Sequence, residues 1–379
     1  MKVIIIGAGI GGLCAARALQ GLGMQVVVYE MTTVLKPVGA GIGLAANAVR
    51  GLDKLGLATA VIQKGKRLTA LQMLDKKGRM ISDQDTSLLN PYYGNTNLVI
   101  HRAELHELLL GYIKEGTLML GKRFAKMEQN SDKVKVIFTD GSTDEADLLI
   151  AADGIHSAVR LQILPHSTPR YAGYTCWRAV IADRGFDFNR EVSAESWAPE
   201  GRFGMAALPG ERIYWYCCVN AAKGDEGMRT MTPEQLAYRF RNIHHPIPEV
   251  LAATKTEQLI WNDIIDIRPL KQFVFGRVVL LGDAAHATTP NMGQGACQAI
   301  EDAVVLADCL RRVGWAEALA QYERRRMERT ARIIQLSRLL GQVSQWEQAW
   351  LCSLRNNCLR ALPQWYIKKQ MKWLFDVDF

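Results

Sequence analysis

The stretch that decides the fold is Met1–Glu30, which reads MKVIIIGAGIGGLCAARALQGLGMQVVVYE. Its run Val3–Ile6 is apolar and β-branched, which predicts a buried parallel strand. Three glycines in the spacing G-x-G-x-x-G follow that strand: Gly7, Gly9 and Gly12. An apolar helical pattern then extends to Gly21, and Val26–Tyr29 predicts a second strand that ends at Glu30. This order of strand, glycine turn, helix and strand indicates a dinucleotide-binding βαβ unit.

Glycine is needed at each of these three positions for a different physical reason. Gly7 permits a tight turn, Gly9 lets the backbone approach a pyrophosphate, and Gly12 lets the helix pack closely on the strand. The helix N-terminus offers unpaired N–H groups and the positive end of its dipole to the phosphates. Glu30 stands where a carboxylate accepts hydrogen bonds from a ribose 2′-OH, and it would repel a 2′-phosphate. The pattern therefore favours NAD or FAD over NADP as the resident dinucleotide.

The composition narrows the class of protein. The 379 residues, 49% apolar and 22% charged, are enough for about two domains of an ordinary globular protein. No apolar stretch is long enough to span a bilayer, and glycines interrupt the N-terminal run that could form a signal peptide, so we expect a cytoplasmic protein. The net charge of +8 is spread along the chain without a nucleic-acid motif, so we expect no nucleic-acid partner. The eight cysteines contain no C-x-x-C pair, and the seven histidines do not join them at zinc spacing, so we expect reduced cysteines and no metal.

Two further strand ends resemble the first turn in character. The apolar runs Asp147–Ala152 and Val278–Leu281 predict buried strands that end in Asp153-Gly154 and Gly282-Asp283. Because the carboxyl ends of parallel strands line one crevice, we expect these pairs to lie near the glycine turn. Residues 171–272 lack the alternation of strands and helices, which predicts a second, mixed or antiparallel sheet inserted into the first domain.

Together with Arg102, these stretches resemble the FAD-dependent monooxygenases of the para-hydroxybenzoate hydroxylase class, which are single-chain aromatic hydroxylases. The resemblance covers residues 1 to about 340 and rests on four motifs. They are the glycine turn, Arg102 before a helix, AADGIHSAVR at Ala151–Arg160, and LGDAAHATTPNMGQG at Leu281–Gly295, which is the most specific. The implied fold is α/β, with a Rossmann-type FAD-binding domain, an inserted mixed β-sheet substrate domain and C-terminal helices.

The resemblance also implies roles for single residues toward FAD. Glu30 would bind the adenosine ribose, Arg102 the pyrophosphate or ribityl region, and Asp283 a ribityl hydroxyl. Gly293–Gly295 would place backbone N–H groups at the flavin N1/O2 edge, where reduced flavin carries negative charge. Asp153-Gly154 would pack at the adenine and pyrophosphate side. The implied FAD contacts are Gly7, Gly9, Ile10, Gly11, Gly12, Glu30, Gly41, Arg102, Asp153, Gly154, Gly282, Asp283, Pro290, Gly293, Gln294 and Gly295.

The inserted sheet is expected to cover the flavin and to bind the substrate. Arg202 and Tyr214 are the candidate catalytic residues, because the sequence around them resembles the part of FAD-dependent urate hydroxylases in which an Arg and a Tyr contact the purine. Three further candidates for substrate contact are Trp177, Arg178 and Tyr216. Strand alternation predicts that Tyr214 and Tyr216 share one face of the sheet. The match to urate hydroxylases is partial, because Trp177 and Arg178 replace a pattern that contains Asn, and urate is one candidate substrate.

The resemblance implies an FAD-dependent monooxygenase. NADH or NADPH would dock transiently and reduce FAD, O2 would form a flavin C4a-hydroperoxide, and a small aromatic or heteroaromatic ring would be hydroxylated. Two alternatives stay open: an FAD oxidase or dehydrogenase, and a peripheral membrane enzyme for a lipid-like quinone or terpenoid. The second rests on the Trp-rich basic tail around Trp365, Lys368, Lys369 and Lys372, for which we favour a helix packed on the body. The expected assembly is a monomer or homodimer.

The expected domain boundaries follow from these assignments. The FAD-binding domain takes residues 1–70, 98–170 and 273–340, the substrate domain takes 71–97 and 171–272, and 341–379 form a C-terminal helical segment.

Overall fold

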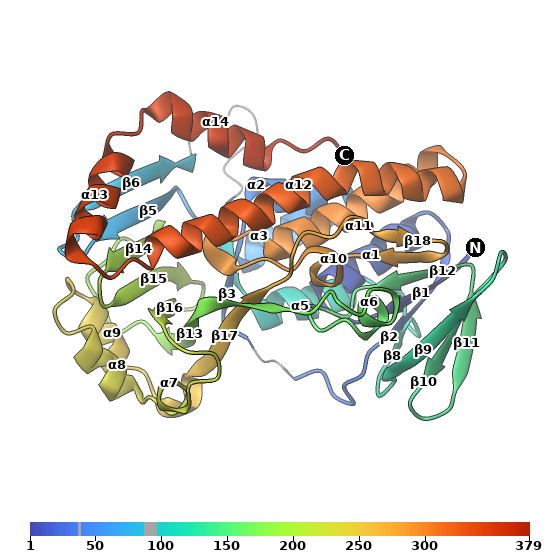
Figure 1. The fold of residues 1–379 in the computed structure, drawn as a ribbon, viewed down its shortest axis with the longest axis horizontal. Helices are drawn as coiled ribbons and strands as arrows, with labels where there is room; N and C mark the ends of the chain where they lie inside the picture. Colours follow the sequence, from blue (N-terminus) through green and yellow to red (C-terminus); the bar gives the residue numbers. More distant parts are fainter. Residues whose placement is uncertain (37–38, 87–96) are drawn as a thin grey trace.

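The computed structural model describes residues 1–36, 39–86 and 97–379, and two large sheets lie toward opposite ends of the molecule (Figure 1). The first sheet has six strands in the order β18-β19-β12-β1-β2-β8. Their bounds are β1 Lys2–Ile6, β2 Gln25–Tyr29, β8 Leu118–Met119, β12 Leu148–Ala151, β18 Val274–Phe275 and β19 Val278–Leu280. All neighbours pair in parallel except β18 and β19. Strands far apart in the sequence therefore end at the same edge, and the predicted Rossmann-type architecture is confirmed.

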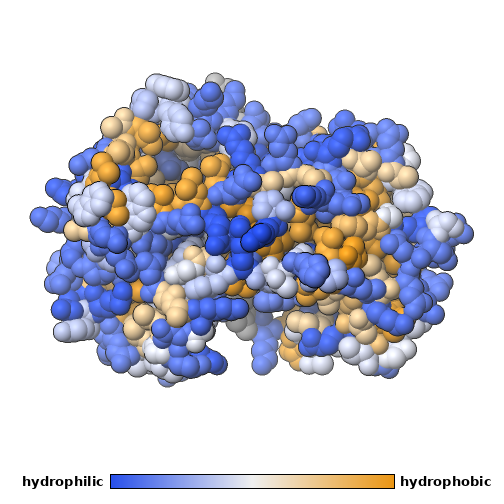
Figure 2. Space-filling view, in the orientation of Figure 1, coloured by the Kyte–Doolittle hydropathy of each residue, from blue (hydrophilic) through white to orange (hydrophobic). Residues whose placement is uncertain are grey.

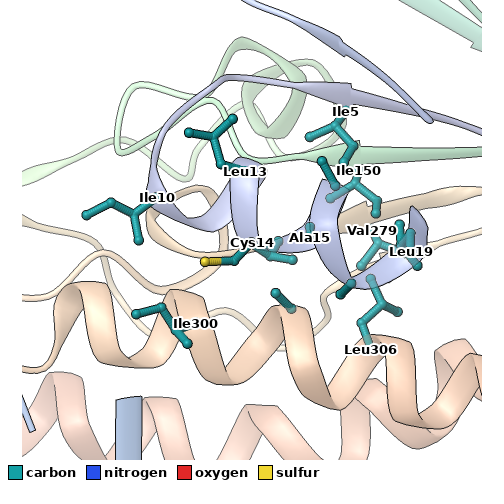
Figure 3. Packing of buried hydrophobic residues seen from close by; sticks show 14 of the residues in the cluster. Ile5, Ile10, Leu13, Cys14, Ala15, Leu19, Ile150, Val279, Ile300 and Leu306 are labelled. Atoms are coloured by element: carbon teal, nitrogen blue, oxygen red, sulfur yellow. The ribbon is translucent and has the colours of Figure 1, made fainter. Parts of the chain in front are cut away.

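The core beneath this sheet is built on helix α1 (Ile10–Gly21), which lies between the strands and helix α11 (Gly295–Arg312) (Figure 3). Buried side chains from all three layers meet there, among them Leu13 and Cys14 of α1 and Ile300 of α11. A Cβ added at Gly11 would lie 2.8 Å from the Leu281 side chain and 3.2 Å from that of Ala299. The small residue at this position therefore sets how closely α1 approaches α11.

The second large sheet has seven strands in the order β17-β13-β16-β15-β14-β5-β6. Their bounds are β5 Ala70–Asp75, β6 Met80–Asp85, β13 Arg170–Ala182, β14 Val192–Ala198, β15 Gly201–Leu208, β16 Arg212–Asn220 and β17 Ile260–Asp266. Only β14 and β5 pair in parallel, so the sheet is mixed, as expected. Strands from residues 70–85 thus join strands from 170–266, while the domain boundaries themselves stay a prediction.

One face of the seven-stranded sheet is closed by short helices. They are α7 Glu226–Arg229, α8 Pro233–Arg239, α9 Ile247–Ala252 and the 3₁₀ helix η2 Thr256–Gln258. Trp177, Phe203 and Trp215 point to this side, where they form one buried cluster with Phe240 and the helices. The opposite face, which carries Tyr214 and Tyr216, therefore remains for other contacts.

Two small antiparallel sheets complete the strand structure of the described residues. One is β9 (Phe124–Gln129), β10 (Val134–Phe138) and β11 (Thr143–Ala146); the other is β3 (Gly41–Leu44), β7 (Leu98–His101) and β4 (Lys66–Arg67). The short helices α5 (Arg102–Gly111) and α6 (Ala158–Ile163) follow strands β7 and β12.

The helices at the C-terminal end join the two halves. Helix α12 (Trp315–Ser344) is 30 residues long and runs from one end of the molecule toward the other (Figure 1). The tail after it was expected as one helical segment, but it forms α13 (Ala349–Arg360) and α14 (Gln364–Phe375), since Pro363 interrupts the helix. Near the N-terminal half, α2 (Ala46–Lys54) is followed by a second short helix, α3 (Ala58–Lys64), after a turn at Gly56, whose φ is +74°.

Among the described residues, no helix combines the length and the apolar character needed to cross a membrane.

Candidate functional site

Three predicted ligand turns meet at one edge of the six-stranded sheet. Ile6, the last residue of β1, is in register with Tyr29 of β2 and Ala151 of β12, and Ala151 is in register with Leu280 of β19. Backbone hydrogen bonds continue this alignment past the strand ends, from Gly7 N to Tyr29 O (2.8 Å) and from Leu281 N to Ala151 O (2.9 Å). The glycine turn, Asp153-Gly154 and Gly282-Asp283 therefore lie side by side, as their positions after parallel strands predicted.

The three fingerprint glycines have distinct surroundings. A Cβ at Gly7, whose φ is +103°, would lie 2.4 Å from Ala152 O, and a Cβ at Gly12 would lie 2.0 Å from Gly7 O. Both positions exclude any side chain for reasons of protein packing alone. Gly9 is exposed, and no atom lies within 4 Å of its Cβ position. Packing leaves Gly9 free to carry a side chain, so the space beside it is available to a ligand.

Glu30 anchors this turn through its carboxylate. One oxygen accepts a hydrogen bond from Ala8 N at 3.0 Å, and the other accepts one from Thr32 N at 3.0 Å. Since each carboxylate oxygen can accept a second hydrogen bond, Glu30 can position the turn and still bind ribose hydroxyls.

Two acids and an arginine line the same edge. Asp283, the first residue of α10 (Asp283–His286), is exposed to solvent, yet desolvation by the surrounding protein raises its carboxyl pKa against the opposing charges of His286 and Arg102. Asp153 is half-buried with a raised pKa, again from desolvation, and its Oδ1 is buried without a hydrogen-bond partner. Arg102 is exposed at the start of α5.

The start of α11 supplies the backbone donors expected near a flavin. Gly293 has φ +63° after the 3₁₀ helix η3 (Pro290–Met292), and neither Gly293 nor Gly295 has an atom within 4 Å of its Cβ position. Pro290 and Gly293 are exposed, whereas Gln294 is buried and its Oε1 accepts a hydrogen bond from Asn47 Nδ2 at 2.9 Å. The N-terminus of an 18-residue helix is thus presented to an open space.

A buried network of charged side chains supports the Gly282-Asp283 turn and the start of α11. Asp302 accepts hydrogen bonds from Gly282 N (2.8 Å) and Arg326 Nε (2.6 Å), and its other contact is His286 Nε2 (2.6 Å). Glu301 pairs with Arg326 and with Arg329. Burial raises the pKa of Asp302, but His286 and Arg326 lower it by more, so the carboxyl pKa lies below its ordinary value. The sequence reasoning missed this network; the adjacent acids in α11 and the basic cluster in α12 were its only signal.

The face of the seven-stranded sheet that lies opposite the short helices brings together Arg178, Tyr214 and Tyr216. The two tyrosine rings lie 5.9 Å apart, and the charge of the Arg178 guanidinium acts on the Tyr214 hydroxyl. Desolvation raises both phenol pKa values, so these hydroxyls stay neutral donors at ordinary pH. A Cβ at Gly41 would lie 2.3 Å from the Tyr214 ring, which therefore lies against the β3 backbone.

The structure contradicts the predicted substrate contact at Trp177. Its side chain is completely buried in the core on the opposite face of the sheet, together with Trp215. Neighbouring residues of a strand point to opposite faces, so Trp177 cannot join Arg178 at a shared site.

Arg202 is 2% exposed and is held by protein groups. It donates hydrogen bonds to Gln345 Oε1 (2.9 Å), Asn291 Oδ1 (2.8 Å) and Glu195 Oε1 (3.1 Å). Tyr174 donates to the same Asn291 oxygen at 3.0 Å. Asn291 lies in η3, next to the start of α11, so these bonds connect the seven-stranded sheet to the ligand turns. Asn291 was within the Leu281–Gly295 motif, but its contact with the distant strand could not be read from the sequence.

These features fit the dinucleotide that the sequence implies. Four features lie around this one edge of the sheet: an open glycine, a buried carboxylate oxygen without a partner, an exposed acid and arginine, and an open helix N-terminus. The individual contacts to FAD remain predictions.

Comparison with known proteins agrees with this site. Residues 1–337 match the model of the FAD binding domain family. The chain is 38% identical to the aurachin C monooxygenase/isomerase of Stigmatella aurantiaca over 96% of its own length and 94% of the relative's. It is 33% identical to the 2-heptyl-3-hydroxy-4(1H)-quinolone synthase of Pseudomonas aeruginosa, with the same shares covered. The crystal structure of Klebsiella pneumoniae HpxO complexed with FAD and uric acid is similar at a TM-score of 0.89 and 31% identity, covering 99% of this chain and 96% of that one.

Proposed function

This chain belongs to the family of FAD-dependent hydroxylases that carry the FAD binding domain, and from that premise we propose that it hydroxylates a nitrogen-containing aromatic ring with an apolar substituent. The protein is an enzyme of the FAD-dependent monooxygenase class. When bound, FAD supplies the activation of O2. Two electrons come from NADH or NADPH, one oxygen atom enters the ring, and the other leaves as water.

The observation that carries the substrate proposal is the double environment of Tyr214. On one side the positive charge of the Arg178 guanidinium acts on its hydroxyl. On the other side its ring packs on an apolar cluster, made of Leu68, Val99, Ala206 and Leu208 with Leu71 and Val180 beside them. A neutral phenol and a guanidinium can orient a ring carbonyl or hydroxyl, while the apolar cluster favours a hydrocarbon substituent.

The names of two similar proteins suggest two different kinds of substrate. The quinolone in the name of one relative is a nitrogen heterocycle with a ring carbonyl and a seven-carbon chain, whereas uric acid is polar on every edge. The apolar cluster beside Tyr214 supports the first kind of ligand. Urate hydroxylation is the second candidate, supported by the 31% identity and TM-score of 0.89 to the protein solved with uric acid.

In this proposal Arg202 acts as a positioning residue. Its guanidinium holds Asn291, Gln345 and Glu195 together, so it would fix the substrate-binding sheet against the flavin turn. Correct placement matters because a reacting carbon must lie within about 3–3.5 Å of the oxygen that it receives.

The test is a substrate panel measured by NAD(P)H oxidation and by mass spectrometry of the products. We expect 2-heptyl-4(1H)-quinolone to stimulate NAD(P)H oxidation and to gain one oxygen atom, with urate giving no stimulation above the substrate-free rate. Preference for urate would overturn the apolar-substituent proposal. Reduction of the flavin by the substrate itself, without NAD(P)H, would instead indicate an oxidase or dehydrogenase.

A further inference from the structure

Large apolar side chains are exposed on the C-terminal helix pair, α13 and α14. Five of the fifteen exposed large hydrophobic residues in the described part of the chain fall within residues 350–366. They are Trp350, Leu354, Trp365 and Tyr366 in the two helices and Leu362 in the connection between them. Trp350 and Trp365 are the extreme cases, with 68% and 67% of their surface exposed. Exposed aromatic residues gathered in this way mark a surface that binds something.

The inner faces of the two helices are firmly attached, so the exposure is a property of folded helices. Arg355 of α13 donates hydrogen bonds to Val343 O (3.2 Å) and Ser344 O (3.1 Å) and stacks over the Trp197 ring. Met371 and Phe375 of α14 are buried against Ala46 of α2. The exposed apolar residues lie on the outer faces, as the spacing of four between Trp350 and Leu354 requires.

The charge of this segment is entirely basic. Between Glu347 and Asp376 the sequence has five Lys or Arg residues and no acidic residue. Lys368 and Lys369 are exposed three and four positions after Trp365, which places them beside that indole on the outer face of α14. Trp and Tyr with adjacent lysines are typical of the headgroup layer of a bilayer, where the rings have one apolar and one wet side.

A groove of about 270 Å³ adjoins this surface, between the helix pair and the edge strand β6 of the seven-stranded sheet. Its apolar lining includes Met80, Ile81, Leu359, Leu362 and Ile367. Arg360 holds the helices to the sheet here, through hydrogen bonds to Asp75 Oδ2 (2.8 Å) and Met80 O (2.9 Å). The end of the molecule that carries α13 shows hydrophobic side chains at the surface in Figure 2.

We propose that α13 and α14 form a docking surface for the headgroup layer of an anionic bilayer. Trp350, Leu354, Trp365 and Tyr366 enter the interface, and Lys368 and Lys369 contact anionic headgroups. The enzyme then binds peripherally, with the β6 groove turned toward the lipid. A second copy of the chain fits this surface less well, since a two-fold contact would bring the lysines of both copies together without an acidic partner.

The experiment uses the FAD-loaded full-length enzyme and co-sedimentation with vesicles. One set contains phosphatidylcholine alone, and the other contains phosphatidylcholine with phosphatidylglycerol at about three to one. We expect binding to the anionic vesicles, weaker binding to the neutral ones, and loss of binding as salt rises. Trp350→Ser with Trp365→Ser should weaken binding at least tenfold, since the buried apolar area is lost. Neutralising Lys368 and Lys369 should cost roughly fivefold for each lysine.

Two matched substitutions elsewhere serve as controls. Tyr238→Ser removes an aromatic residue that is also 67% exposed, and Lys255→Gln removes an exposed lysine, both outside the helix pair. Both should leave vesicle binding unchanged. Absence of binding to anionic vesicles, or equal loss in the controls, would overturn the proposal. So would a dimer in sedimentation velocity that the two Trp substitutions dissociate. Vesicle binding is measured without turnover, so it tests the docking surface separately from the proposed function. Vesicle binding can fail while hydroxylation in solution succeeds, and hydroxylation can fail while vesicle binding succeeds.

Discussion

Replacing Gly9 by valine should remove FAD binding and leave the apoprotein folded. Gly9 lies at the N-cap of α1 with φ −73° and ψ −178°, a conformation that any L-residue adopts. No atom of the protein lies within 4 Å of its Cβ position. A valine side chain therefore meets nothing in the apoprotein and occupies the space in which a pyrophosphate would approach the backbone.

The magnitudes separate the two effects. Valine is a poorer N-cap than glycine, which should cost the apoprotein about 1 kcal/mol. FAD at a thousand times its Kd stabilises the wild type by about 4.1 kcal/mol, and the variant should lose this contribution. A hundredfold loss of affinity corresponds to roughly 2.7 kcal/mol. The change in FAD-dependent stabilisation should therefore exceed the change in the apoprotein itself.

The assay is thermal unfolding of the apoprotein with and without added FAD, together with the FAD stoichiometry from the flavin absorbance. Gly21→Ala is the matched control at the other end of α1, where the Cβ position is equally open. Full FAD stoichiometry in Gly9→Val, or an unfolded apoprotein, would refute the assignment of this turn. Gly12→Val, by contrast, should not fold, because its Cβ would lie 2.0 Å from Gly7 O.

Three further outcomes are expected. Arg326→Met leaves two buried carboxylates, Glu301 and Asp302, without their main counter-charge, so the enzyme should lose about 3–5 kcal/mol of stability, and an unchanged melting temperature would contradict this. The pKa of Asp302 is lower in the folded protein than in the unfolded chain. Its ionised carboxylate therefore stabilises the fold above the ordinary carboxyl pKa near 4, and this stabilisation is lost as the pH falls through the lowered value. Asp302→Asn should accordingly make the melting temperature less dependent on pH in this acid range. Tyr214→Phe and Arg202→Met should keep FAD but lower the ratio of hydroxylated product to NAD(P)H consumed, by about tenfold and by ten- to a hundredfold respectively, whereas an unchanged ratio would remove that residue from the site.

The buried network of α11 and α12 connects two parts of the site that the sequence motifs describe separately. Asp302 holds Gly282 N and contacts His286, while Glu301 and Gln298 lie against Asn47 and Gln294. One set of hydrogen-bonded charges in α11 and α12 therefore positions both the Asp283 turn and the start of α11. A rigid support of this kind keeps binding groups in place before the ligand arrives.

The sequence by itself determined the parts of the protein that depend on local rules. The run Val3–Ile6, the glycine spacing and Glu30 specify a strand, a turn and a second strand, because each needs only residue size, φ/ψ freedom and periodicity. The alternation that places Tyr214 and Tyr216 on one face is likewise local. Since parallel strands end at one edge, the meeting of Gly7, Asp153 and Asp283 could also be inferred.

Only the tertiary structure decided which side chains are buried or hydrogen-bonded within the protein and which remain available to a ligand. Trp177 and Arg178 are neighbours in sequence, yet burial against α8 and α9 takes Trp177 into the core and leaves Arg178 beside Tyr214. Arg202 finds its partners Asn291 and Gln345 more than eighty residues away in the chain, and no local pattern encodes such contacts. Burial and hydrogen-bond partners are properties of the packed molecule, which is why they separate a core residue from a site residue when composition and spacing do not.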